Sequence, residues 1–276
     1  MTKPTVIAHR GFSAVAPENT LPAFEHAIDA GADMIEFDIR LTTDKQFVVI
    51  HDATLERTTT GCGVVENNTL SQLQMLDAGS WFGRGFAGTV LPSLDEALTL
   101  CRNRVLVNVE VKTEIQDDLS LNRLADLVGE QVNALGATRS VVISSYARRI
   151  ITRLQERHEH LTTALLSDAH SSNKAITKLA CVSGATALHI PHRLASSSLA
   201  ERTKQAGLLS AAHTVNETTD MQTLIQMGFD ALFTDHPDRM RAYVDRHSGS
   251  KETAWSKHLS TEGVYSTELT ESTALR

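Results

Sequence analysis

Short runs rich in strand-forming residues alternate along the chain with longer segments in which apolar residues recur every three or four positions. The short runs are typical of buried strands, and the longer segments predict amphipathic helices. We expect strands at 6–9, 34–40, 47–51, 105–112, 141–145, 163–167, 187–190, 209–214 and 231–235. We expect helices at 20–30, 93–100, 119–135, 147–157, 173–181, 199–206 and 218–227. Alternation of this kind predicts an α/β fold with a parallel sheet.

The nine expected strands are one more than a (β/α)8 TIM barrel needs. Only a few residues separate the second run from the third, whereas parallel neighbours need a crossover of about a dozen residues or more. These two runs must therefore form an antiparallel hairpin. Without the returning strand, eight parallel strands remain. The chain length of 276 residues suits one such barrel, because the fold usually takes about 250 residues.

Two segments fall outside the strand and helix alternation. Residues 53–90 combine several glycines with only short apolar runs, and we expect a small insertion over the C-terminal mouth of the barrel. The stretch 247–276 is rich in Ser, Thr and Glu, with little periodicity, and is expected to be a disordered tail. Trp255, Leu259 and Val264 nevertheless offer apolar side chains that could dock. The barrel domain itself is expected to span 1–246.

The hairpin brings chemically useful side chains together. A two-residue turn at Asp44 and Lys45 would place Asp38 opposite His51. Glu36 is two residues from Asp38 and therefore lies on the same face of the strand. The hairpin thus predicts two carboxylates and one imidazole on a single surface.

A second polar row is expected at the fourth strand. Asn108, Glu110 and Lys112 alternate with three valines. In a barrel one of these sets faces the helices and the other faces the interior. The valines suit the helix side, so the polar set points inward. His9 and Arg10 end the first strand in the same way, and barrel enzymes build their sites at this C-terminal end.

Glu36, Asp38 and Glu110 would repel one another at one barrel mouth unless a cation joined them. Oxygen ligands without cysteine favour a hard divalent metal, Mg²⁺ or Ca²⁺.

Arg10 and Lys112 beside such an ion suit a phosphate group. His9 and His51 could supply a general acid and a general base. Together these residue types indicate hydrolysis of a phosphoester.

Composition narrows the alternatives. The formal net charge is −7 and aromatic residues make up 5% of the chain, which disfavours binding to nucleic acid or to an anionic membrane surface. Three widely separated cysteines suggest neither a disulfide framework nor a zinc cluster. The sequence shows no signal-peptide core and no apolar run of about 18 residues. We therefore expect a cytoplasmic protein with a small-molecule substrate.

The sequence resembles the glycerophosphodiester phosphodiesterase family of the cytosolic bacterial type. The likeness extends over roughly residues 5–240 and rests on several spaced motifs, at 9–11, 17–20, 31–38, 51–59, 77–82, 91–96, 109–112, 214–216 and 234–237.

The resemblance implies a set of roles. Glu36, Asp38 and Glu110 would bind the divalent metal. His9 and His51 would be the catalytic acid–base pair, and Arg10 and Lys112 would contact the substrate phosphate. The family hydrolyses glycerophosphodiesters, the deacylated phospholipids, to sn-glycerol 3-phosphate and an alcohol.

The sequence departs from the family pattern at two places. Asp44-Lys45 stands where Asp-Gly is frequent, and Lys fits the left-handed backbone of a primed turn less well than Gly does. His213 stands where a Trp is frequent, at a position expected to line the substrate pocket together with Trp81 and Phe82.

Alternative interpretations remain for several of these residues and for the whole chain. Trp81 and Phe82 could pack within the insertion instead of covering substrate. Glu110 and Lys112 could form a structural ion pair, and Asp235 is expected to cap the last helix in preference to orienting a neighbour. The whole chain could also be a phosphodiesterase of the sphingomyelinase D type, which gives a cyclic phosphate, or a non-catalytic barrel that binds a phosphorylated ligand.

Overall fold

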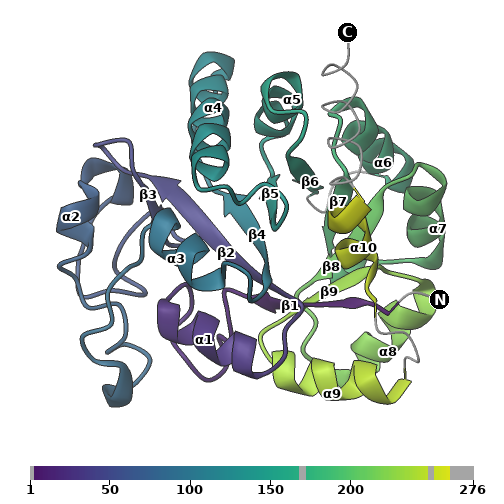
Figure 1. Ribbon diagram of the computed structural model, residues 1–276, viewed down its shortest axis with the longest axis horizontal. Coiled ribbons are helices and arrows are strands. Elements are labelled where there is room, and N and C mark those ends of the chain that lie inside the picture. Colours follow the sequence, from purple (N-terminus) through teal and green to yellow (C-terminus); the bar gives the residue numbers. More distant parts are fainter. Residues whose placement is uncertain (1–2, 168–171, 248–251, 262–276) are drawn as a thin grey trace, which may run out of the picture.

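The computed structural model describes residues 3–167, 172–247 and 252–261, and its parallel strands close into a barrel (Figure 1). The barrel strands are β1 (Thr5–His9), β2 (Met34–Leu41), β4 (Leu106–Val111), β5 (Val141–Ser145), β6 (Thr162–Leu166), β7 (Ala187–Pro191), β8 (Leu209–His213) and β9 (Ala231–Thr234). Their order around the barrel is β1-β9-β8-β7-β6-β5-β4-β2, and a parallel pairing of β1 with β2 closes the circle. The predicted (β/α)8 fold is confirmed.

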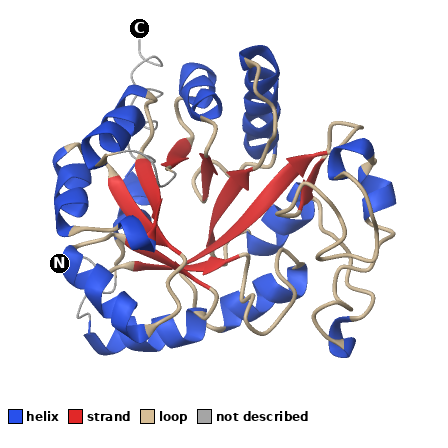
Figure 2. Cartoon of the chain, turned by 180° about the vertical axis from the view of Figure 1, so that it is seen from behind, coloured by secondary structure: helices blue, strands red, loops and turns tan. Residues whose placement is uncertain are grey.

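Helices surround these strands, as the view from behind shows (Figure 2). The main ones are α1 (Leu21–Asp29), α3 (Leu94–Cys101), α4 (Asp118–Ala134), α5 (Arg148–Arg157), α6 (Asn173–Val182), α7 (Ser197–Gln205), α8 (Thr218–Met227) and α9 (Pro237–His247). A short 3-10 turn, η3 (His192–Leu194), follows β7. Among the helices that the structure describes, none is both long and apolar enough to cross a membrane.

Local sequence explains how individual elements begin and pack. α3 starts at a capping box, in which the Ser93 side chain accepts from the Glu96 backbone N–H and the Glu96 side chain accepts from the Ser93 backbone N–H. The valines of β4 lie in the large apolar cluster shared with helix residues such as Leu124 and Val128 of α4. The predicted alternation in β4 therefore holds, with valines toward the helices and the polar set toward the barrel interior.

The hairpin formed by β2 and β3 (Phe47–Val49) has a different register from the predicted one. Leu41 pairs with Phe47, and the backbone N–H of Ile50 donates to the Asp38 carbonyl at 3.0 Å. Asp38 is therefore opposite Ile50, and the predicted pairing with His51 is wrong by one residue. The cause is the length of the loop, which has three residues where two were predicted. Lys45, the last loop residue, adopts the left-handed conformation with φ of 59°.

The segment 53–90 forms a separate lobe beside the hairpin (Figure 1). It contains η1 (Val65–Asn67), α2 (Leu70–Leu73) and η2 (Arg84–Phe86). The lobe packs on the hairpin through a small apolar cluster of its own, made of Val48, Ile50, Leu55, Val65, Leu73, Ala78 and Leu91. The segment predicted as an insertion is thus a lobe attached to β3 and outside the barrel wall.

The N-terminal end of the barrel interior is filled by a side chain from a helix that follows the last β/α unit. The interior there is lined by small side chains on four successive strands, Ala164, Ala187, Ala211 and Ala231, where bulky residues are usual. Trp255 of α10 (Ala254–Thr261) packs among them and is completely buried.

The expectation of a disordered tail from 247 is accordingly wrong for 254–261. These residues gain order because the large apolar surface of Trp255 is removed from water. Residues 248–251 and 262–276, with Val264 among them, lie outside the described residues.

Candidate active site

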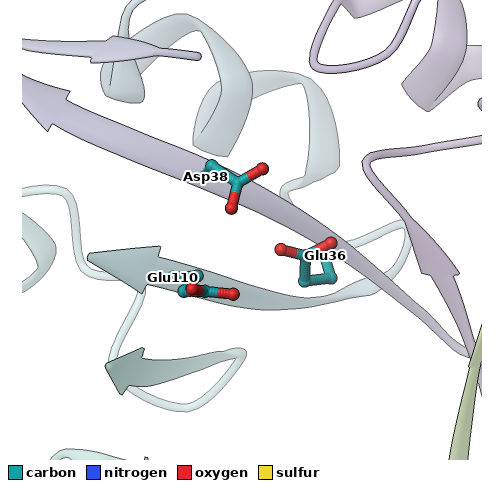
Figure 3. Close-up of side chains that lie close together, drawn as sticks. All are labelled: Glu36, Asp38 and Glu110. Atoms are coloured by element: carbon teal, nitrogen blue, oxygen red, sulfur yellow. The ribbon is translucent and has the colours of Figure 1, made fainter. Parts of the chain in front are cut away.

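Three carboxylates from two neighbouring strands meet inside the barrel at its C-terminal end (Figure 3). Asp38 of β2 is in register with Glu110 of β4, and Glu36 is one pleat earlier on β2. One oxygen from each of the three carboxylates lies within 4.8 Å of the others. All three side chains are buried, with exposures of 1%, 1% and 7% for Glu36, Asp38 and Glu110. The structure thus brings together the trio predicted from the sequence.

The trio fits a hard divalent cation. Burial, followed by repulsion from Asp38, raises the pKa of Glu36 to about 8, and the same two causes raise the pKa of Glu110. Glu36 Oε2 accepts a hydrogen bond of 2.9 Å from the Arg10 backbone N–H, but the buried Oε1 has no partner. A bound cation would satisfy this oxygen and offset the repulsion, and an all-oxygen ligand set suits Mg²⁺ or Ca²⁺.

Asp38 is the member of the trio whose pKa is lowered. Although burial opposes its charge, Lys112 and Arg10 bring its pKa down to about 2. The Lys112 ammonium and the Arg10 Nε each lie 3.3 Å from one of its oxygens. Asn19 also contacts Asp38 twice: its Nδ2 donates to Oδ2 at 2.9 Å, and its Oδ1 accepts from the Asp38 backbone N–H at 3.1 Å.

Asn19 was not predicted as a site residue. Its only signal was membership of the 17–20 motif, because a buried amide and an exposed loop amide look alike in sequence.

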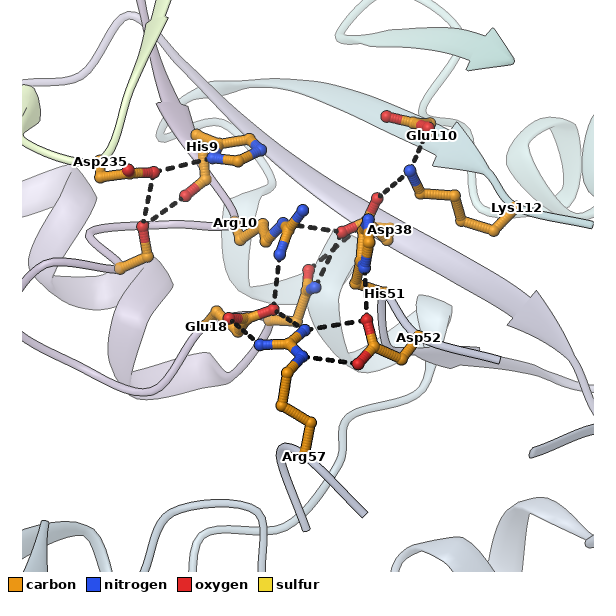
Figure 4. A network of polar contacts seen from close by, with 12 residues as sticks. His9, Arg10, Glu18, Asp38, His51, Asp52, Arg57, Glu110, Lys112 and Asp235 are labelled. Atoms are coloured by element: carbon orange, nitrogen blue, oxygen red, sulfur yellow. Dashed lines mark hydrogen bonds and ion pairs between the residues drawn. The ribbon is translucent and has the colours of Figure 1, made fainter. Parts of the chain in front are cut away.

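His9, at the end of β1, is oriented by a carboxylate from the opposite end of the sequence (Figure 4). Its Nδ1 lies 2.8 Å from Asp235 Oδ1, and the same carboxylate accepts from Ser13 Oγ at 3.1 Å and Asn216 Nδ2 at 2.7 Å. Burial lowers the pKa of His9, but Asp235 and Glu36 outweigh it, so that the pKa is raised. The expectation that Asp235 would cap the last helix is wrong, because side chains of the site occupy its oxygens.

His51 reaches the site from the turn after β3, beyond the end of the ladder. Its Nδ1 lies 2.6 Å from Oδ1 of the adjacent Asp52, and burial lowers the pKa of His51. Each of the two histidines thus has a carboxylate at Nδ1. That arrangement favours a proton on Nδ1 and leaves Nε2 as the nitrogen that can exchange a proton with a ligand.

Two basic side chains, Lys112 and Arg10, lie beside the carboxylate trio. Lys112 lies 2.5 Å from Glu110 Oε1, so the ion pair considered from the sequence is present, together with the contact to Asp38. Arg10 Nη1 donates to Glu18 Oε1 at 2.8 Å. Both cations are therefore at the barrel mouth and beside the predicted metal ligands.

A cavity of about 400 Å³ opens next to His9. Its lining includes Arg10, Glu18, Asp235 and the insertion residues Trp81 and Phe82. The two aromatic rings meet edge to face at 5.6 Å, and the Trp81 indole N–H donates to a backbone carbonyl in the insertion. They therefore pack against each other and also line the cavity, which places this part of the insertion at the barrel mouth.

His213, the last residue of β8, is not among the residues that line this cavity. Its ring packs 5.9 Å from that of Phe233, and burial lowers its pKa to about 3. The buried Nε2 has no hydrogen-bond partner. His213 ends β8 at the C-terminal end of the barrel, and His9 and Lys112 are among the charged groups that influence it. It therefore lies near the same barrel mouth, and its contact with substrate stays a prediction.

Comparisons with known proteins agree over most of the chain. A family model described as the glycerophosphoryl diester phosphodiesterase family matches residues 9–239. A protein of Caldanaerobacter subterraneus subsp. tengcongensis named glycerophosphodiester phosphodiesterase is 35% identical over 239 residues, covering 86% of this chain and 96% of that protein.

Solved structures of phosphodiesterases also superpose on most of the chain. An Oleispira antarctica phosphodiesterase, in complex with the product sn-glycerol-3-phosphate, superposes with a TM-score of 0.79 at 27% identity, covering 88% of this chain and 97% of the other. A glycerophosphodiester phosphodiesterase of Agrobacterium tumefaciens superposes with a TM-score of 0.73 at 30% identity, covering 87% and 99% of the two chains.

Proposed function

We propose a specific reaction for this chain, which belongs to the glycerophosphoryl diester phosphodiesterase family. The reaction is metal-dependent hydrolysis of glycerophosphodiesters, the deacylated phospholipids, to sn-glycerol 3-phosphate and an alcohol. The observation that carries the proposal is the buried carboxylate trio beside two histidines at one barrel mouth. The related Oleispira antarctica enzyme was solved with sn-glycerol-3-phosphate as its product, which supports the choice of substrate.

Glu36, Asp38 and Glu110 would bind the divalent metal, Mg²⁺ or Ca²⁺. The unpaired Oε1 of Glu36 supports this assignment, because a buried carboxylate oxygen without a partner is costly. When bound, the metal supplies positive charge that stabilises the phosphate oxygens during cleavage.

His9 and His51 would perform the proton transfers. One of them takes a proton from the attacking water, and the other gives a proton to the leaving alcohol oxygen. Asp235 and Asp52 contact the two Nδ1 atoms at 2.8 and 2.6 Å. Each carboxylate thereby keeps its imidazole in one orientation and stabilises the charged form of the ring.

Arg10 and Lys112 would bind the phosphate group. Both now contact carboxylates of the site at 3.3 Å or less. With a divalent cation held by Glu36, Asp38 and Glu110, Arg10 and Lys112 would be available to donate to phosphate oxygens. We assign Trp81, Phe82 and His213 to the pocket for the organic part of the substrate.

The proposal is tested with a panel of glycerophosphodiesters that differ in headgroup, with sn-glycerol 3-phosphate as the detected product. We expect turnover that is abolished by EDTA and restored by Mg²⁺ or Ca²⁺. His9→Ala and His51→Ala should each lower turnover while metal binding persists, whereas His160→Ala, an exposed residue far from the site, is the control. Full activity after removal of the metal would refute metal dependence.

The same assay separates the alternatives. Hydrolysis in ¹⁸O-labelled water should place label in the phosphate product. A cyclic phosphate without label would indicate attack by a substrate hydroxyl, as in the sphingomyelinase D type. Tight binding of the diester without turnover in the parent protein would favour a non-catalytic binding role.

A further inference from the structure

We propose that Arg57 is a positioning residue that fixes His51 and Arg10 relative to each other through the carboxylates of Asp52 and Glu18. Arg57 belongs to the insertion, and the proposed reaction gives it no direct part. The inference rests on the proposed function, because it assigns proton transfer to His51 and phosphate binding to Arg10.

The guanidinium of Arg57 binds two carboxylates at once (Figure 4). Toward Asp52, its Nε donates to Oδ2 at 2.6 Å and its Nη2 donates to Oδ1 at 3.0 Å. Toward Glu18, its Nη1 donates to Oε2 and its Nη2 donates to Oε1, both at 2.8 Å. All four carboxylate oxygens therefore receive a hydrogen bond from a single side chain.

The oxygens that Arg57 binds are the ones that contact the site. Asp52 Oδ1 also lies 2.6 Å from His51 Nδ1, and Glu18 Oε1 also accepts from Arg10 Nη1 at 2.8 Å. One nitrogen, Arg57 Nη2, thus donates to both shared oxygens. A continuous path of polar contacts joins the imidazole after β3 to the guanidinium after β1.

Only a planar guanidinium suits this position. Two anionic carboxylates around one point would repel without a cation between them, and the donors of arginine form a fixed fork that matches both. Hydrogen bonding from Arg57, with His51 as a further cause, holds the pKa of Asp52 well below its usual range. Burial opposes the charge of Glu18, but Arg57 and Arg10 lower its pKa. Both carboxylates therefore stay ionised and continue to accept from His51 and Arg10.

The position of Arg57 argues against a mainly stabilising role. Its side chain is 44% exposed, and ion pairs of exposed residues contribute little to folding stability. Loss of Arg57 should therefore change the geometry of the site more than the stability of the fold.

Kinetics of Arg57→Ala, with Arg104→Ala as the matched control, test the inference. Arg104 makes a similar two-bond contact with Glu25 at 2.9 and 2.7 Å, and its side chain is 39% exposed, away from the site. Arg57→Ala should lower kcat and also weaken inhibition by inorganic phosphate, with a combined loss in kcat/KM on the order of 10- to 100-fold. Arg104→Ala should change neither value by more than about twofold.

The conservative variant and a double-mutant cycle show whether Arg57 acts through its carboxylates. Arg57→Lys should recover only part of the activity, because it restores the charge without the fork. Arg57→Ala combined with Asp52→Asn should cost less than the product of the two single losses, since both break one path. Normal kcat in Arg57→Ala, or fully multiplicative losses in the double variant, would overturn the inference.

A measurement without turnover separates this inference from the proposed function. In ¹⁵N-histidine-labelled protein, the His51 Nδ1 proton bound to Asp52 should give a protected NMR signal that Arg104→Ala retains and Arg57→Ala loses. An unchanged signal in Arg57→Ala would contradict the positioning role. A parent protein that shows this signal but hydrolyses no glycerophosphodiester would instead refute the proposed function.

Discussion

The Nδ1 atom of His9 lies 2.8 Å from Oδ1 of Asp235, although the two residues are 226 positions apart in the sequence. Barrel closure creates this contact. β1 pairs with β9 in parallel, and Ala8 is in register with Thr234. The residues that follow these partners therefore leave the barrel side by side at its C-terminal end, one supplying an imidazole and the other a carboxylate.

We expect Asp235→Asn to lower kcat on the order of 10- to 100-fold while KM changes little. The neutral asparagine amide cannot stabilise a protonated His9. Its NH2 group can also face Nδ1, which would turn the imidazole ring. Steady-state kinetics at saturating metal measure the effect. Asp245→Asn is the control, because that exposed carboxylate binds Lys3 away from the site. Equal kcat values for the two variants would show that Asp235 does not act on His9.

Loss of the Glu36 carboxylate should weaken binding of the divalent metal. We expect Glu36→Gln to raise the concentration of Mg²⁺ or Ca²⁺ needed for half-maximal activity by at least about tenfold, because a neutral amide replaces a charged ligand. Calorimetric titration of the metal into the stripped protein should show the same loss. Glu66→Gln, in the insertion, is the control. An unchanged metal requirement in Glu36→Gln would remove this residue from the ligand set.

The metal-free protein should become less stable as pH rises through about 8. Burial and Asp38 raise the pKa of Glu36 from 4.5 to about 8 in the folded protein. The folded state therefore binds a proton that the unfolded state has released between these two values, and linkage makes the free energy of unfolding fall across this window. Urea denaturation in EDTA at pH 5, 7 and 9 measures the trend.

Two comparisons decide the source of that pH dependence. Glu36→Gln should make it shallower, because one of the carboxyl groups with a raised pKa is gone. Saturating metal should also remove it, because the bound cation keeps the carboxylates ionised. A parent protein whose stability in EDTA is constant from pH 5 to pH 9 would contradict the raised pKa of Glu36.

Trp255→Ala should reduce the free energy of unfolding by about 3 to 5 kcal/mol, the usual cost of truncating a large buried aromatic residue. The indole packs against the four alanines of β6 to β9, and these short side chains cannot close the cavity that it leaves. Urea denaturation measures the loss. Met75→Ala, at a residue that is 86% exposed, should cost less than about 0.5 kcal/mol. Equal losses in both variants would show that α10 is not part of the core.

Much of the site was predictable because its residues occupy regular strands. Alternation along a strand is a local property, so the inward direction of Glu36, Asp38 and Glu110 followed from the sequence pattern. The parallel order of β2 and β4 then required that the side chains at their C-terminal ends lie together. The hairpin was predicted for a similar reason, because too few residues separate its strands for a crossover.

The register of that hairpin was decided by the loop. Lys45 adopts a left-handed conformation that allows three loop residues, and the shift moves the partner of Asp38 from His51 to Ile50. His51 still reaches the site because it lies beyond the last strand residue, where the alternation of the strand no longer sets its direction.

The amino-acid pattern by itself determined the parallel barrel, the hairpin and the acidic trio, because each follows from strand periodicity and from the lengths of connections. Tertiary structure alone decided that Asp235 contacts His9, that Asn19 contacts Asp38, and that Trp255 fills the barrel end. These contacts join segments whose separation in sequence carries no information about distance. They form only when the barrel closes and removes their side chains from water, so packing of the whole chain selects them.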